Sequence, residues 1–116
     1  FTNALPEKEA KELYAKYAMP APGRPLFQAA TATFNPSSAT KVNVANASRG
    51  PLLLVSGEKD NTVPPVLVKS ALKAYRKSPA VTELKEFSGR GHSLTIDSGW
   101  RELAEYSLSW LKAKGF

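Results

Sequence analysis

The chain has 116 residues, of which 42% are apolar and 22% are charged, with a formal net charge of +6. This length suits one small domain, and this composition is typical of a globular protein rather than a disordered one. Because the chain has no cysteine and a single histidine, disulfides, thiolate metal sites and multi-histidine metal sites are excluded. No apolar run approaches the roughly 20 residues that cross a bilayer.

The basic charge does not by itself indicate a nucleic-acid partner. The lysines and arginines are scattered along the chain, and Arg76 and Lys77 are the one adjacent pair. No run of basic residues alternates with aromatic residues, and no zinc-finger or helix-turn-helix signature is present. We therefore expect no nucleic-acid partner. A basic binding protein is kept only as a rival hypothesis, which predicts an affinity that falls steeply with salt.

Residues 1–50 predict helices and no strand. Residues 7–18 follow Pro6 and place four apolar residues on one helical face. These residues are Ala10, Leu13, Tyr14 and Tyr17. A proline-rich and glycine-rich loop follows at residues 19–25, and a second short helix is expected over residues 25–34.

The rest of this first half predicts a loop over residues 35–50, because Pro36 stops the second helix. The chain starts at Phe1 rather than at methionine and enters helical sequence almost at once. This start indicates a piece of a longer protein or a processed product.

From residue 51 the pattern changes to strand, helix, strand, helix. Residues 51–57 (PLLLVSG) form a continuous apolar run, which suits a strand covered by helices on both faces. Residues 81–87 (VTELKEF) predict a second, more polar strand nearer a sheet edge. The helix between them opens at Pro64 and Pro65 and ends before Pro79. Its apolar face consists of Val68, Ala71, Leu72 and Tyr75.

The last helix is expected over residues 100–112 and is followed by Gly115 as a stop signal. Its predicted apolar stripe contains Trp100, Leu103, Ala104, Ser107, Leu108 and Leu111. Two parallel strands alone do not make a stable sheet. A strand as apolar as residues 51–57 needs a neighbouring strand on each side. Either the chain oligomerises or the rest of the sheet lies elsewhere, and we favour the second explanation.

Polar loops follow both predicted strands. Asp60 lies in GEKDNTVP after the first strand, and His92 lies in GRGHS after the second. Because the carboxyl ends of parallel strands meet at one edge of a sheet, both residues are expected on adjacent loops at that edge. A carboxylate beside an imidazole there is an orienting acid beside a general base.

These segments resemble the α/β-hydrolase superfamily. PLLLVSGEKDNTVPP is similar to the penultimate strand with its acid turn, and FSGRGHSL to the last strand with its histidine loop. SWLKAKGF is similar to the end of the terminal helix. The resemblance covers residues 51–116 and implies Asp60 as the catalytic acid and His92 as the catalytic base.

The fold class implied is α/β: the carboxyl-terminal part of a hydrolase sheet, with two strands and flanking helices. Residues 51–116 would form this part of the core. Residues 1–50 resemble, more loosely, the end of a helical cap.

Each of these residues also has a structural interpretation. Asp60 could serve only as a turn former before a helix, and the glycines around His92 could serve only to tighten a loop. Asp97 is a rival carboxylate, but it precedes the last helix and is expected to serve that helix's amino terminus. Glu58 is expected to be solvated.

The nucleophile of the superfamily is missing. Its G-x-S-x-G elbow is absent, as is the upstream oxyanion loop. Ser56 lacks the preceding glycine and following helix, Ser93 adjoins His92 and would point away, and Ser48 lies before the first strand. We therefore expect a carboxyl-terminal portion that is inactive alone and completed by an amino-terminal portion, as a separate chain or a cleaved fragment.

The resemblance implies an esterase-like or lipase-like serine hydrolase that acts on a small ester-like molecule with no metal or organic cofactor. Four aromatic residues are candidates for the substrate pocket, although ordinary packing would also explain them: Tyr14, Tyr17, Phe27 and Phe34. Dehalogenase, epoxide hydrolase or haloperoxidase chemistry on the same fold and a non-catalytic interaction module stay open as alternatives.

Overall fold

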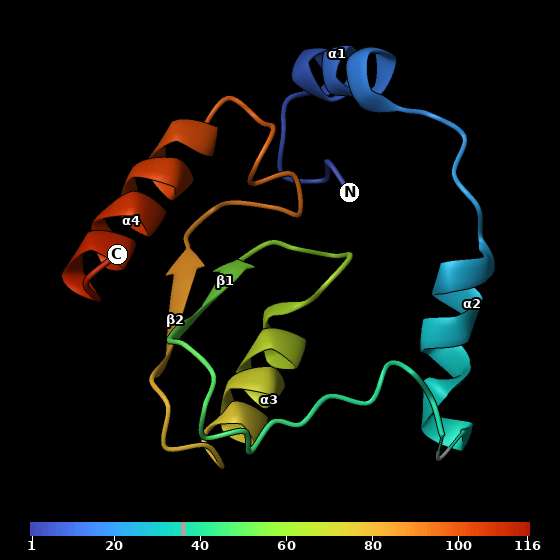
Figure 1. Ribbon diagram of the computed structural model, residues 1–116. Coiled ribbons are helices and arrows are strands. Elements are labelled where there is room, and N and C mark those ends of the chain that lie inside the picture. The colour runs from blue at the N-terminus through green and yellow to red at the C-terminus, as the bar shows by residue number, and fades with distance from the viewer. Residues whose placement is uncertain (36) are drawn as a thin grey trace.

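The computed structural model describes residues 1–35 and 37–116, with the side chain of Thr33 left aside. Helices and strands follow one another as the sequence predicts (Figure 1). In chain order they are α1 (Glu7–Tyr17), α2 (Arg24–Thr31), the 3-10 helix η1 (Ala32–Phe34), β1 (Leu52–Gly57), α3 (Pro65–Tyr75), β2 (Thr82–Phe87) and α4 (Trp100–Ala113). The expected second helix is therefore present but divided, because its last turn tightens into η1.

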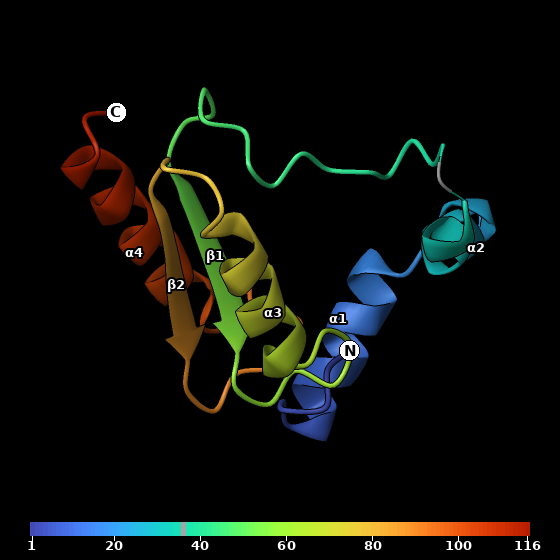
Figure 2. The ribbon, with the colours of Figure 1, turned by 90° about the horizontal axis from the view of Figure 1, so that it is seen from below.

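The two strands pair in parallel, with Leu52 opposite Thr82 and Gly57 opposite Phe87. Figure 2 shows the pair between α3 on one side and α4 on the other. This parallel two-stranded sheet with flanking helices confirms the predicted fold class.

The core lies between the sheet and α4. Phe87 and Leu103 are buried there together with Leu94 of the loop between β2 and α4, and Val55 and Tyr106 pack against them. The rings of Phe87 and Tyr106 meet edge to face, with 5.9 Å between their centroids. Side chains alternate across a strand, so every second residue of β2 reaches this face.

The predicted apolar stripe of α4 is partly wrong. Leu103 is buried as expected, but Trp100, Leu108 and Leu111 are 42–52% exposed, and Trp110 is buried instead. The indole N–H of Trp110 donates to the carboxylate of Glu83 on β2 at 2.7 Å. This partner on the more polar strand satisfies the indole nitrogen, so the helix turns Trp110 inward.

The helices α1 and α2 lie apart from the two strands. No residue of α1 or α2 is buried, and α2 lies farther from the strands than α1 (Figure 2). The division into a cap (residues 1–50) and a core portion (residues 51–116) stays a prediction. Within the described residues, no helix is long and apolar enough to cross a membrane.

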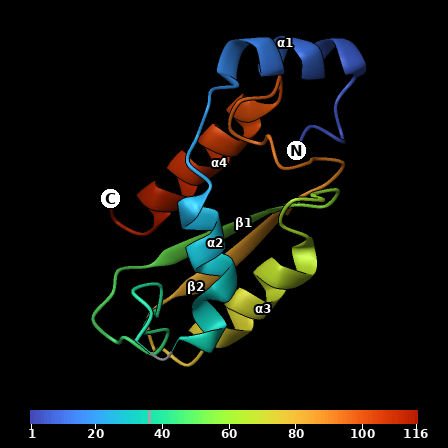
Figure 3. The same cartoon turned by 90° about the vertical axis from the view of Figure 1, so that its right-hand side faces the viewer.

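Arg49 clamps the amino-terminal ends of both strands. Its guanidinium donates to the carbonyls of Gly50 and Val81 at 2.9 Å each and to that of Ala80 at 3.1 Å. It also donates to the hydroxyl of Thr82. The opposite, carboxyl-terminal ends of the strands lead into the two loops that contain Asp60 and His92, and the amino-terminal segment lies beside these loops (Figure 3).

Candidate active site

Two loops at the carboxyl ends of the strands lie against each other. The acid loop (residues 58–64) follows β1, and the histidine loop (residues 88–99) follows β2. The backbone N–H of Glu58 donates to the carbonyl of Phe87 at 3.0 Å, and that of Lys59 donates to the carbonyl of Arg90 at 2.8 Å. The parallel ladder thus continues into the loops and fixes their relative position.

Asp60 and His92 come together across these loops. Oδ2 of Asp60 lies 2.8 Å from Nδ1 of His92, although 32 positions separate the two residues. Oδ1 of Asp60 accepts the backbone N–H groups of Thr62 and Val63, each at 2.8 Å. Asp60 therefore forms the turn before α3 and contacts the imidazole at once, so the structural and functional interpretations of this residue are compatible.

The environment of Asp60 favours its ionised form. Burial of the carboxylate, which is 7% exposed, acts to raise its pKa. Hydrogen bonds from two backbone N–H groups and from His92, with the charge of a protonated imidazole, outweigh burial and lower the pKa below its ordinary value. An ionised carboxylate only accepts hydrogen bonds, so Nδ1 of His92 donates and Nε2 of the neutral ring is left as an acceptor.

Glu58 departs from the expectation that it is merely solvated. It is exposed, but one of its carboxylate oxygens accepts the N–H of Gly89 at 2.6 Å and the hydroxyl of Ser88 at 2.8 Å. The hydrogen bond from Gly89, followed by that from Ser88, lowers the pKa of Glu58. Glu58 is thus a second tie between the acid loop and the histidine loop.

Asp97 is not a rival partner for His92. Its Oδ1 accepts the N–H of Gly99 at 3.0 Å, in the turn before α4. Among the described residues its side chain accepts no N–H group of the helix itself, so the expected role at the amino terminus of this helix is not seen. Its side chain is also bound by Arg90 and Ser93, which the sequence did not predict. No hydrogen bond joins Asp97 to the imidazole among the described residues.

None of the three serines weighed as nucleophiles hydrogen-bonds to His92. Ser93 is 1% exposed, and its hydroxyl is directed to Asp97 at 3.3 Å. Ser56 is 2% exposed, and its hydroxyl has no hydrogen-bond partner among the described residues. Ser48 lies before β1, at the opposite end of that strand from Asp60.

The amino-terminal segment contacts both loops. The ring of Phe1 lies 4.8 Å from the His92 ring, centroid to centroid, with 76° between the ring planes. The side-chain amide of Asn3 donates to the carbonyl of Lys59 at 2.7 Å. Contacts between segments so far apart in sequence have no periodic signature, so Phe1 could not be predicted as a neighbour of the imidazole.

An apolar cavity of about 350 Å³ lies between this segment, α1 and the histidine loop. Its walls include Phe1, Leu13, Tyr14, Tyr17 and Ile96. Two of the four predicted pocket aromatics, both on α1, therefore line it. Phe27 and Phe34 line none of the described cavities and are 74% and 87% exposed.

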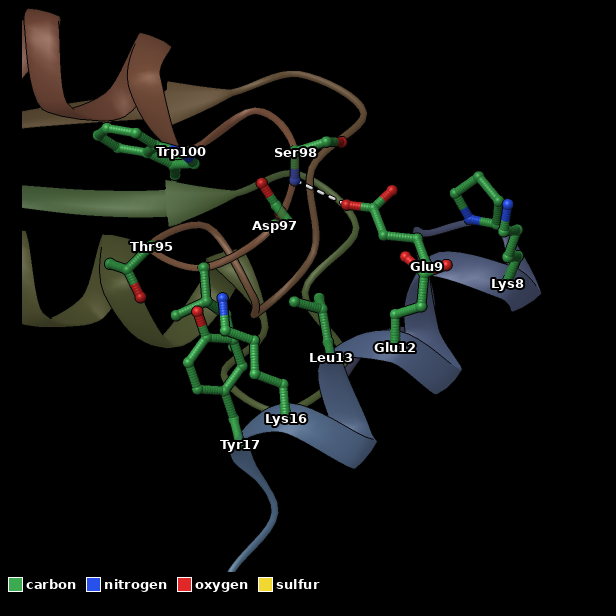
Figure 4. A pocket seen from close by; sticks show the side chains of 12 residues that line it. Lys8, Glu9, Glu12, Leu13, Lys16, Tyr17, Thr95, Asp97, Ser98 and Trp100 are labelled. Atoms are coloured by element: carbon green, nitrogen blue, oxygen red, sulfur yellow. Dashed lines mark hydrogen bonds between the residues drawn. The ribbon is translucent and has the colours of Figure 1, made fainter.

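A second, more open cleft of about 770 Å³ separates α1 from residues 95–100. Figure 4 shows Glu9 of α1 reaching across it, where its carboxylate accepts the backbone N–H of Ser98 at 2.6 Å. Leu13 and Tyr17 line this cleft as well as the apolar cavity. Over the described part of the chain, no group of three metal-ligating side chains gathers.

Comparison with known proteins gives a family match over most of the chain. The model of the dienelactone hydrolase family matches residues 16–114. No curated protein is significantly similar to the chain.

Solved structures with a similar fold include two structures of esterase 2 (Est2) of the planctomycete Thermogutta terrifontis. The structure of this thermophilic esterase with bound butyrate is 25% identical with a TM-score of 0.53, over 62% of this chain and 28% of that chain. Its structure phosphorylated by paraoxon is 21% identical with a TM-score of 0.54, over 69% of this chain and 35% of that chain. The chain thus spans about a third or less of the length of this esterase.

Proposed function

Because this chain belongs to the dienelactone hydrolase family of α/β-hydrolases, we propose that it is the carboxyl-terminal portion of a serine hydrolase that cleaves esters. In this proposal Asp60 is the acid and His92 the general base of a Ser–His–Asp triad. An amino-terminal portion supplies the nucleophilic serine and the oxyanion hole.

The observation that supports this proposal best is the 2.8 Å contact between Oδ2 of Asp60 and Nδ1 of His92. A triad needs its carboxylate on the imidazole nitrogen that faces away from the serine. Both residues lie in loops at the carboxyl ends of parallel strands, where open α/β sheets bind their ligands. The side chain of His92 is 30% exposed, so its ring is accessible to a further partner.

The reaction begins when Nε2 of His92 accepts the proton of the serine hydroxyl and the serine oxygen attacks the ester carbonyl carbon. The imidazolium then donates this proton to the departing alcohol, which leaves an acyl-serine. Water loses a proton to His92 and cleaves the acyl-serine, and the proton returns to the serine. Asp60 keeps the proton of the neutral ring on Nδ1, and it stabilises the imidazolium during both the formation and the hydrolysis of the acyl-serine.

The surface of the chain supports completion by another portion. Among the described residues β1 pairs only with β2, so its other edge has no partner, although the first four residues of β1 (Leu52–Val55) are apolar. On α4, the exposed side chains of Trp100, Leu108 and Leu111 form a second apolar face. The remaining strands and helices of a hydrolase would cover this edge and this face.

The apolar cavity supports an ester with a compact apolar group. Its volume of about 350 Å³ is at the small end of the range for ligand pockets. Phe1 forms one of its walls and also contacts the His92 ring, so the cavity lies on the other side of the Phe1 ring from the base. In this proposal residues 1–50 form part of a cap, and Tyr14 and Tyr17 line the pocket.

Turnover of p-nitrophenyl butyrate by the complete hydrolase tests the proposal. Replacing His92 with glutamine removes the base while keeping the size of the side chain, and we expect kcat to fall by about 10⁴-fold or more. Glu105→Gln, at an exposed position of α4, is the control and keeps full turnover. Unchanged turnover in the His92 variant contradicts the proposal and favours a non-catalytic interaction module.

A further inference from the structure

Arg90, two residues before His92, is held at both its backbone and its side chain. Its carbonyl accepts the N–H of Lys59 in the acid loop at 2.8 Å. Its guanidinium donates to the carbonyl of Gly99 at 3.1 Å and to the carboxylates of Asp97 and Glu102. The side chain is only 15% exposed. A rigid guanidinium fork held by three acceptors fixes the position of the loop more firmly than a single contact does.

Asp97 is the buried acceptor of this arrangement. It is 1% exposed and accepts hydrogen bonds from the guanidinium of Arg90, the N–H of Gly99 and the hydroxyl of Ser93. Arg90 lies two residues before His92, and Ser93 directly follows it. The same carboxylate therefore holds the chain on both sides of the histidine.

The backbone around His92 needs such ties because glycine makes it permissive. Gly89 has a φ of +70°, and Gly91 immediately precedes the histidine. Glycine leaves many backbone conformations accessible, so neither residue restricts where the imidazole points. The direction of the ring must come from contacts outside these two residues.

We propose that Arg90 and Asp97 are a positioning pair that holds the loop around His92 and thereby keeps its imidazole against Asp60. This proposal rests on the proposed function, because it assigns the pair a role in the same triad. No hydrogen bond joins either residue to the imidazole among the described residues, so they act through the backbone. Loss of the pair costs turnover through the geometry of the base rather than through substrate binding.

Arg49 offers a matched control for this role. It too is partly buried and donates to several acceptors, but it clamps the amino-terminal ends of the strands. A purely structural clamp predicts the same consequences for both arginines. A positioning role predicts that only Arg90 affects the chemistry.

The experiment compares Arg90→Lys with Arg49→Lys in the complete hydrolase, with p-nitrophenyl butyrate as the substrate. Lysine keeps the positive charge, so the buried carboxylate of Asp97 is not left without a cation. It lacks the guanidinium fork, so the loop around His92 is held less firmly. For Arg90→Lys we expect kcat to fall about tenfold to a hundredfold with KM within about twofold of the starting value. For Arg49→Lys we expect kcat within about twofold, even where the melting temperature falls.

A spectroscopic measurement separates positioning from stability. The imidazole ¹⁵N signals that disappear in His92→Gln belong to His92. In Arg90→Lys we expect these signals to broaden or shift and the Nδ1 proton to exchange faster with solvent, whereas Arg49→Lys leaves them unchanged. Ser93→Ala is a milder variant for the case in which Arg90→Lys fails to fold. It removes one hydroxyl from Asp97, and we expect a smaller fall in kcat of about twofold to fivefold.

Equal losses of kcat in Arg90→Lys and Arg49→Lys would overturn the positioning role, as would an unchanged kcat and unchanged imidazole signals in folded Arg90→Lys or Ser93→Ala. If His92→Gln abolishes turnover while Arg90→Lys leaves it intact, the positioning role alone fails and the proposed triad stands. If His92→Gln also keeps full turnover, both proposals fail.

Discussion

A β-carbon added to Gly57 would lie 2.6 Å from the carbonyl oxygen of Arg90, so the end of β1 and the histidine loop meet with no side chain between them. The carbonyl oxygen of Gly91 would be equally close. Only a hydrogen atom fits at this position, and that allows the acid loop and the histidine loop to approach each other. The contact between Asp60 and His92 depends on this approach.

Replacing Gly57 with alanine therefore forces the two loops apart. We expect a loss of about 1–3 kcal/mol in the free energy of unfolding, because overpacking against backbone is relieved only by moving it. Gly50→Ala is the control, since a β-carbon there meets nothing within 4 Å. Denaturant unfolding of both variants checks the prediction, and equal stabilities would show that the loops do not meet as described.

Replacing Asp60 with asparagine should impair the chemistry more than the fold. The amide can donate to Nδ1 and so favour the wrong tautomer of His92, which we expect to lower kcat by about 10⁴-fold. Turnover of p-nitrophenyl butyrate measures the rate, and ¹⁵N shifts of the imidazole report the tautomer. A variant that keeps both its kcat and the tautomer with the proton on Nδ1 would remove Asp60 from the triad.

Lowering the pH should decrease the free energy of unfolding through protonation of Asp60. The pKa of this carboxyl is lower in the folded chain than its ordinary value of 3.8, so the unfolded chain binds more protons in that range. Its contribution to stability is full above about pH 5 and is lost as the pH falls through the folded-state pKa. Urea unfolding between about pH 2 and pH 6 should show a shallower pH dependence in Asp60→Asn, and an identical slope would contradict the assignment.

The apolar cavity should govern substrate size. Leu13 lines it from α1, and tryptophan at this position would occupy part of its roughly 350 Å³. We expect kcat/KM for a phenyl-substituted ester to fall about tenfold, with a smaller effect on an acetate ester. Phe27→Trp, on a side chain of α2 that is 74% exposed, is the control. Equal effects on both esters would place substrate binding elsewhere.

The sequence predicted most of the fold because its signals are local. Apolar runs, helical spacing and prolines place every helix and strand within a few residues of its observed position. The face that α4 presents to the sheet was less predictable, because that helix has two apolar faces. Trp110 turns inward toward Glu83, a partner 27 positions away, and spacing along the helix contains no information about it.

At the site, the contact between Asp60 and His92 was predictable because parallel strands bring their carboxyl ends together. The ties that hold the two loops were not. Glu58 seemed solvated because an exposed carboxylate usually is, and only folding brings Gly89 to it. The hydrogen bond between Arg90 and Asp97 depends on the path of an irregular loop, and such a loop has no periodic sequence pattern from which the path could be predicted.

Reaction of the complete hydrolase with paraoxon, followed by mass spectrometry of its peptides, tests the central claim most directly. We expect one phosphorylated serine that lies outside residues 1–116, and we expect His92→Gln to slow its formation at least about a hundredfold. A phosphorylated serine within these residues, or an equal rate of phosphorylation without His92, would contradict the account.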